Sequence, residues 1–160
     1  MLITKESARY KPLGIHVLQS DDDNAVHWFL DDKTDMRSSN YLEDAATEIQ
    51  VQGLELDYTC LLWDADFRYK NGQWQYYTWN RQKSEWKALI PDTESKQERM
   101  QYMLNAYRVL LTRARAGMII CVPEGNAHKT ASGFWEDSTR LPEYYDGTYQ
   151  YLKSLGLQEI

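Results

Sequence analysis

A helix that leads directly into an apolar strand is the sequence feature that most restricts the fold of this chain. Apolar residues recur at helical spacing between Met100 and Leu111, and residues 118–122 (MIICV) form an uninterrupted apolar run. Residues 110–116 (LLTRARA) join the two segments. Because strands that alternate with helices build α/β sheets with parallel strands, this junction predicts an α/β fold.

Other segments fit the same alternation. Residues 57–63 (DYTCLLW) are the clearest buried strand, residues 1–4 and 14–18 are shorter extended pieces, and residues 145–155 form a final helix that Gly156 ends. We expect a helix from residue 6 that Pro12 and Gly14 end, and an acidic loop over residues 20–39. Residues 41–49 fit a strand or a helix. The whole chain, residues 1–160, is expected to be one domain.

An aromatic segment interrupts the pattern between residues 67 and 90. Asn71 and Gly72 predict a hairpin turn, flanked by strand-like residues 67–69 and 74–77. The segment is therefore expected to be a small aromatic β-hairpin insertion. Its aromatic side chains have two open interpretations, which are stacking on unpaired bases and packing within the protein. The candidates are Trp74, Tyr76, Trp79 and Trp86.

Composition limits the classes of function. A net charge of -6 argues against nonspecific nucleic-acid binding by the whole surface, although Arg108, Arg113 and Arg115 form a local basic patch. No stretch approaches the roughly 20 apolar residues that a membrane span needs. Cys60 and Cys121 lie in apolar runs and are expected to be buried free thiols in a reducing cytoplasm. The histidines show no spacing typical of a metal site.

Two polar segments carry candidate chemistry. Arg113 ends the predicted helix beside a strand, where its planar fork suits a phosphate, although a basic last turn that favours the helix dipole explains it equally well. Gly53 lies in a turn where backbone can approach a ligand closely, with Gln52 and Glu55 on either side. An ordinary turn with a solvated carboxylate is the alternative for this second segment.

Together the two segments resemble motifs V and VI of superfamily 1 DNA/RNA helicases. Thr47, Gln52, Gly53 and Glu55 match the Thr-x-x-x-x-(Lys/Gln)-Gly-x-Glu loop, and residues 110–114 (LLTRA) match the end of the motif VI helix. Residues 2–9 (LITKESAR) resemble motif IV. The longer strings ATEIQVQGLELDYTCLLWDADFRY, NAYRVLLTRARAGMIICVPEG and TRLPEYYDGTYQYLKSLG are similar to the C-terminal portion of a bacterial family of helicase-like ATPases related to the Schlafen helicase region. This resemblance spans nearly all 160 residues.

This resemblance implies a three-layer, RecA-like (P-loop NTPase-like) domain, the second of the two in such a motor, with ATP and Mg²⁺ in the cleft between them. It implies that Arg113 is the arginine finger and that Arg9 is a second γ-phosphate contact. The resemblance further assigns Gln52, Gly53 and Glu55 to nucleotide binding, and Thr47 and Gln50 to coupling with the nucleic-acid strand. Single-stranded DNA or RNA is an expected partner.

The chain departs from a complete motor in one respect. Residues 125–130 (GNAHKT) contain Lys-Thr without the preceding glycine of a G-x-x-x-x-G-K-[ST] phosphate loop. We therefore expect an excised domain or a truncated gene product, whose P-loop ATPase domain is a separate partner and which does not hydrolyse ATP alone. Two alternatives stay open: a non-catalytic module that binds protein or nucleic acid through the aromatic hairpin, and a nuclease-like enzyme using Asp64, Asp66 and Glu55. The second lacks a lysine or further carboxylate to complete its set.

Overall fold

The structure of the protein is a computed structural model that describes residues 1–18, 22–41 and 44–160, apart from the side chains of residues 8–9, 12–13 and 22–24. The chain divides into two compact units. Unit 1 contains Met1–Trp63 and Leu104–Cys121, and unit 2 contains Asp64–Met103 and Val122–Ile160. The assignment of residues 1–160 to a single RecA-like domain stays a prediction.

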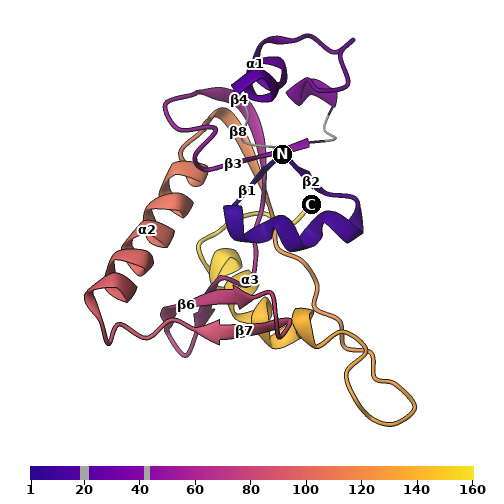
Figure 1. The fold of residues 1–160 in the computed structure, drawn as a ribbon, viewed down its shortest axis with the longest axis vertical. Coiled ribbons are helices and arrows are strands. Elements are labelled where there is room, and N and C mark those ends of the chain that lie inside the picture. Colours follow the sequence, from indigo (N-terminus) through magenta and orange to yellow (C-terminus); the bar gives the residue numbers. More distant parts are fainter. Residues whose placement is uncertain (19–21, 42–43) are drawn as a thin grey trace. The chain divides into compact units, whose positions relative to one another are not determined.

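Unit 1 is built on a five-stranded sheet in which every strand pair is parallel (Figure 1). The strands are β1 (Leu2–Ile3), β2 (His16–Val17), β3 (Asp44–Thr47), β4 (Leu56–Leu62) and β8 (Ala114–Cys121). Their order across the sheet is β2-β3-β1-β4-β8. The predicted α/β fold with a mainly parallel sheet is thus confirmed, and the arrangement is that of a RecA-like domain.

One face of this sheet packs against η1 (Lys5–Leu13), a 3-10 helix. Ile3, Ala45 and Leu62 lie on this face and form a buried cluster with Tyr10 of η1. Gly14 ends η1 with a φ of 83°, a conformation that glycine adopts without steric cost, as its position in the sequence predicts. Tyr58 and Ile119 lie farther along the same face and are exposed, so the cover of η1 stops short of them.

The opposite face of the sheet is covered by the C-terminal half of α2 (Glu94–Leu111). The ring of Tyr107 lies 4.5 Å from that of Trp63, which directly follows β4, and both side chains are buried. Leu110 is also buried, whereas Leu111 is 39% exposed and does not belong to the buried stripe that the helical spacing predicted. The helix therefore presents Ala106, Tyr107 and Leu110 to the core. In its last turn the buried residue is Leu110, whereas the sequence predicted Leu111.

The acidic segment before β3 differs from the sequence expectation. Residues 22–30 form a helix, α1 (Asp22–Leu30), so the loop predicted over residues 20–39 is wrong for this part, while residues 20 and 21 lie outside the described residues. Trp28 is buried, and its indole N–H donates to the carbonyl of Asp44 at 3.2 Å. The aspartates at the start of α1 stabilise the N-terminus of a helix. We interpreted the same acidic residues as a sign of a polar loop. The ambiguous residues 41–49 contain a strand, β3.

The two cysteines are free, and neither is fully buried. Cys60 is half-buried in β4, and Cys121 at the end of β8 is exposed. The prediction of free thiols is confirmed, whereas the prediction that both are buried is wrong. Because β8 is the last strand of the sheet, its side chains have a neighbouring strand on one side alone.

Unit 2 contains a three-stranded antiparallel sheet with α3 (Asp146–Ser154) packed on it. The strands are β5 (Phe67–Lys70), β6 (Gln73–Asn80) and β7 (Glu85–Ala88). Asn71 and Gly72 have φ angles of 54° and 80°, which confirms the predicted hairpin turn. The insertion thus has one strand more than a hairpin, and the final helix is found where the sequence predicts it.

The aromatic side chains of the insertion pack against one another and against α3. Phe67 stacks on Trp74 with ring centroids 4.4 Å apart, and Tyr69 stacks on Tyr151 of α3 at 4.0 Å. Trp86 meets Trp79 edge to face, and its indole N–H donates to the carbonyl of Thr139 at 3.0 Å. These contacts support the packing interpretation of the insertion over the base-stacking one.

A buried arginine lies inside this aromatic unit. The guanidinium of Arg68 lies 3.8 Å from the ring centres of both Tyr77 and Tyr144, and its Nε–H donates to the carbonyl of Ala65 at 2.5 Å. Burial lowers the pKa of Arg68, and the neighbouring Tyr77 and Tyr144 partly offset this effect. Two aromatic faces thus replace part of the hydration that the guanidinium loses.

No helix in the described part of the chain is both long enough and apolar enough to cross a membrane.

We predict that Gly147→Ala destabilises unit 2, although alanine is the better helix former. Gly147 lies in the first turn of α3, and a Cβ there would collide with the carbonyl oxygen of Tyr69 in β5. Overpacking of this kind costs about 1–3 kcal/mol of the free energy of unfolding, measured by denaturant titration followed by tryptophan fluorescence. The control is Gln150→Ala, an exposed position on the same helix. Equal stability of the two variants would contradict the close packing of α3 on β5.

Candidate functional site

Arg113 lies between the end of α2 and the start of β8, and its guanidinium binds two other segments of unit 1. Its Nε–H donates to the carbonyl of Val109 in the last turn of α2 at 3.0 Å. Its Nη1 donates to the carbonyl of Leu54 at 3.0 Å, and its Nη2 donates to the hydroxyl of Thr112 at 3.2 Å. One arginine thus satisfies a helix-end carbonyl and attaches the helix end to the turn that precedes β4.

The turn before β4 contains the predicted nucleotide-binding residues. Gly53 has a φ of 83°, and a Cβ there would meet nothing within 4 Å, so the backbone angle alone favours glycine. The turn is anchored by Val51, which is fully buried and donates its N–H to the carbonyl of Thr47. Gln52, Gly53 and Glu55 are exposed. The structure therefore brings these three residues to the surface next to Arg113.

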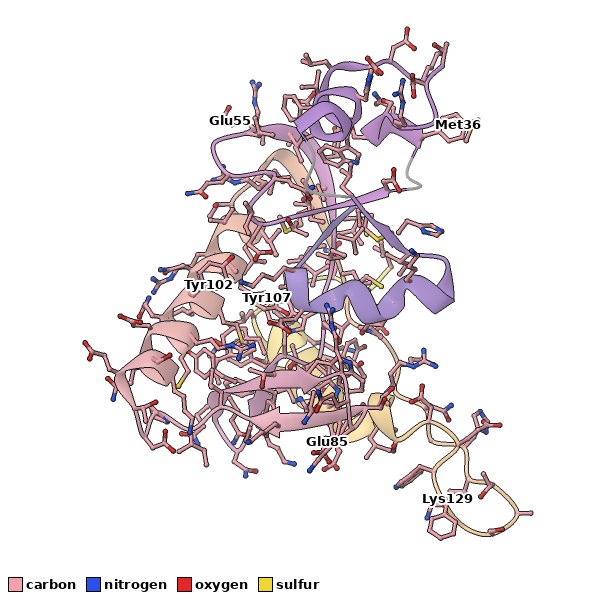
Figure 2. The ribbon with its side chains drawn as sticks, viewed as in Figure 1. Met36, Glu55, Glu85, Tyr102, Tyr107 and Lys129 are labelled. Atoms are coloured by element: carbon pink, nitrogen blue, oxygen red, sulfur yellow. The ribbon has the colours of Figure 1, made fainter. Side chains whose placement is uncertain are left out.

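A second arginine, Arg115, also reaches this turn. Its Nε lies 3.8 Å from Oε2 of Glu55, and the two side chains are 64% and 74% exposed (Figure 2 labels Glu55). Both residues lie where the parallel strands β4 and β8 begin. An exposed ion pair of this kind contributes little to stability, so Glu55 and Arg115 can both turn to another ligand at small cost. We call Gly53–Glu55 with Arg113 and Arg115 the amino edge of the sheet.

Thr47 and Gln50, the predicted coupling residues, lie next to each other at the other end of the strands. The Thr47 N–H and hydroxyl both donate to Oε1 of Gln50, at 2.9 and 3.1 Å, and Nε2 of Gln50 donates to the carbonyl of Leu18. Thr47 is the last residue of β3. The structure therefore places Thr47 at the carboxyl end of β3, whereas Glu55 precedes the amino end of β4.

Glu48 is a site residue that the sequence reasoning missed. It is 5% exposed, and its Oε2 accepts the backbone N–H of Lys5, which begins η1, at 3.1 Å. A carboxylate at the start of a helix is stabilised by the unpaired N–H groups there. The signal in the sequence was an acidic residue directly after Thr47, the threonine of the motif V loop. The bond from Lys5 to Glu48 joins this loop to the segment that resembles motif IV.

Arg9 can be placed only by its backbone, because its side chain lies outside the described residues. It belongs to η1, which follows the carboxyl end of β1. Arg113 precedes the amino end of β8 in the same parallel sheet. The two arginines thus come from segments attached to opposite ends of the strands.

Two of the three carboxylates of the nuclease-like alternative are inaccessible, and the third, Glu55, is exposed. Asp64 and Asp66 are fully buried, and Oδ1 of Asp64 accepts the backbone N–H of Ala65 at 2.6 Å. A buried carboxylate with such a bond stabilises a local turn and has no surface to offer a substrate.

Residues 125–130 form no helix, whereas a phosphate loop leads into one.

A cluster of His27, Asp31 and Asp35 is another feature that the sequence reasoning did not identify. Their potential ligand atoms lie within 4.8 Å of one another, and His27 Nδ1 is 2.7 Å from Asp31 Oδ2. Arg37 binds both oxygens of Asp35, at 3.0 and 2.8 Å, and these bonds hold the pKa of Asp35 below its usual range. The arginine thus already neutralises one of the three groups, and the cluster is a local hydrogen-bonded network.

Comparison with protein families identifies one match. A family model described as Schlafen group 3, DNA/RNA helicase domain, matches residues 3–124 of the 160 residues. This range contains the parallel sheet except Leu2, together with the amino edge and the aromatic insertion. Comparisons with curated proteins and with solved structures find no significant match.

We predict that Arg113→Ala lowers the free energy of unfolding by about 2 kcal/mol, because it removes charge-assisted hydrogen bonds to two carbonyls. Arg115→Ala is the matched control, since its exposed ion pair should contribute at most about 0.5 kcal/mol. Urea denaturation of both variants measures the difference. A loss of stability in Arg115→Ala as large as that in Arg113→Ala would show that Arg113 does not hold the helix end to the turn.

Proposed function

The chain belongs to the Schlafen group 3 DNA/RNA helicase domain family, and from this premise we propose that it is the C-terminal, RecA-like half of a helicase-like, ATP-dependent DNA/RNA motor. In this proposal the amino edge faces ATP and Mg²⁺ held by a separate P-loop domain. The observation that carries the proposal is the bond from Arg113 to Leu54, which joins the motif VI helix end to the motif V turn. Residues about sixty positions apart thereby form one polar surface.

The bonding of Arg113 suits the role of an arginine finger. Nη1 and Nη2 each carry two hydrogens, and the bonds to Leu54 and Thr112 use one on each nitrogen. The remaining two N–H groups can donate to phosphate oxygens while the guanidinium stays anchored. Such an arginine is preorganised, so it stabilises charge that develops on the γ-phosphate without a large reorganisation cost.

Glu55 and Gly53 supply the remaining contacts of the proposed half-site. The Glu55 carboxylate is exposed and suits the hydroxyls of the nucleotide sugar, whereas the backbone at Gly53 allows a close approach. Gln52 is exposed beside them. Because Arg115 pairs only loosely with Glu55, we assign Arg115 to the screening of phosphate charge at this edge.

The loop that follows β3 suits a link between the nucleotide and the nucleic-acid strand. Gln50 of this loop is bonded to Thr47 at the carboxyl end of β3, and the carbonyl of Leu54 near the end of the loop accepts a bond from Arg113. Glu48 attaches the same loop to the start of η1. A displacement of the Gly53 turn by the nucleotide would therefore be transmitted to Thr47 and Gln50, the proposed coupling residues.

We predict that this chain restores ATPase activity when it is combined with a P-loop domain of the same family, and that Arg113→Ala and Arg113→Lys abolish it. The expected loss in kcat is at least about a thousandfold. The lysine variant keeps the charge but lacks the planar fork, so it tests geometry separately from charge. Arg108→Ala is the control, because its exposed side chain lies on α2 and donates to Asn105.

Thermal unfolding and the affinity between the two proteins are measured for each variant, so that misfolding is distinguished from lost catalysis. A folded, associating Arg113→Lys variant with full activity would overturn the arginine-finger assignment. A combination of the two wild-type proteins that associates and shows no ATPase activity would overturn the proposal of a shared site.

A further inference from the structure

A structured loop in unit 2 presents aromatic side chains that the packing of the small sheet does not use. Residues 126–137 leave the small sheet and α3 as an open loop (orange in Figure 1), and Figure 2 labels Lys129 on it. Lys129 and Trp135 form an antiparallel bridge, and the Thr130 N–H donates to the carbonyl of Phe134 at 2.8 Å. The Gly133 N–H donates to Thr130 at 2.9 Å and closes the tip with a φ of 82°.

The base of this loop is also held together. The Asn126 N–H donates to the carbonyl of Arg140, and the Arg140 side chain donates to Asp137 at 2.7 Å. Asp137 in addition accepts from the backbone N–H and the hydroxyl of Thr139. The loop is therefore preformed, and a ligand would not have to order it.

Two aromatic rings stand at the tip. Phe134 is 75% exposed and Trp135 is 41% exposed, whereas the aromatic residues of β6 are all half-buried. The ammonium of Lys129 lies 4.5 Å from the ring centre of Trp135. Leaving a phenylalanine ring in water forgoes the free energy that its burial would contribute, so an exposed ring on a structured loop indicates a contact surface.

The chemistry around the rings favours nucleic acid over protein. Lys129 and His128 precede the rings, exposed Glu136 follows them, and the Asp137 carboxylate is paired with the Arg140 guanidinium at 2.7 Å. The neighbouring side chains at the tip, Thr130 and Ser132, are small and polar, so the rings do not belong to a continuous apolar patch of the kind that proteins bury at interfaces. Separate aromatic faces next to a cation are typical of surfaces that bind single strands.

We propose that the loop of residues 126–137, which we call the aromatic loop, is a contact site for single-stranded nucleic acid. Phe134 and Trp135 stack on unpaired bases, and Lys129 binds the phosphate backbone. The inference rests on the proposed function, because it names a contact for the strand on which such a motor moves. The aromatic loop lies outside the residues that match the family model.

The test is fluorescence anisotropy of the full chain with labelled oligothymidylate and oligouridylate of about 15 nucleotides. The double variant Phe134→Ala/Trp135→Ala should weaken binding about tenfold or more, because two stacking surfaces are lost. Lys129→Gln should weaken binding and reduce the salt dependence by about one phosphate contact. The matched control is Tyr58→Ala, which removes an aromatic side chain that is 78% exposed on β4 in unit 1.

Photocrosslinking to bromouracil-substituted strands gives a second readout. Trypsin cleaves after Lys129 and Arg140, so a crosslink to either ring is recovered on one peptide, residues 130–140. Crosslinks on this peptide would support the aromatic loop. Crosslinks that lie elsewhere in the chain would overturn it.

Each outcome separates this inference from the proposed function. If the wild-type chain binds single strands and the loop variants bind equally well, the aromatic loop is excluded and the proposed motor stands. If the wild-type chain binds neither strand, both the loop and the nucleic-acid part of the proposed function fail, whereas the ATPase reconstitution tests the nucleotide part independently. Equal affinity for duplexes would overturn base stacking. Loop variants that lose only the association with the P-loop domain would show that the surface binds protein.

Discussion

The guanidinium of Arg113 joins the last turn of α2 to the turn before β4 in unit 1. It donates to the carbonyl of Val109 in the last turn of α2 and to the carbonyl of Leu54 in the turn before β4. Arg113 itself directly precedes β8. The Leu56 N–H also bonds to the carbonyl of Arg113 at 2.9 Å, so side chain and backbone hold the same turn. The position of Gly53 and Glu55 relative to the helix end depends on these bonds. Any ligand at the amino edge therefore meets a surface that is already assembled.

The loop between β3 and β4 connects two environments of different character. At its start Thr47 and Glu48 are buried and bonded within the protein, and at its end Gln52 and Glu55 are exposed. Buried polar groups with satisfied bonds make the first part rigid, whereas the exposed residues are available to a ligand. The family model matches residues 3–124, so the match includes both the buried start and the exposed end of this loop.

Unit 2 uses its aromatic residues in two ways. Those of the small sheet and α3 form stacked and edge-to-face pairs, with Arg68 enclosed between Tyr77 and Tyr144. Phe134 and Trp135 instead stand at the tip of a loop whose base is held by Asp137 and Arg140. The composition is aromatic in both segments, so composition alone does not distinguish an internal ring from a surface ring. Neighbouring strands and α3 cover the first group, whereas Phe134 is 75% exposed and Trp135 is 41% exposed.

The sequence by itself determined the features that repeat over short distances. Helical spacing placed α2, the apolar runs placed β4 and β8, and Asn71-Gly72 placed the hairpin, because each signal involves residues close together in the chain. The motif resemblance predicted that Gly53 and Arg113 lie close together. It did not predict the bond from Arg113 Nη1 to the carbonyl of Leu54 that holds them there. Tertiary structure alone decided that Asp64 and Asp66 are buried and that Cys121 is exposed. Each of these depends on which distant segment covers a residue, and local periodicity carries no information about that.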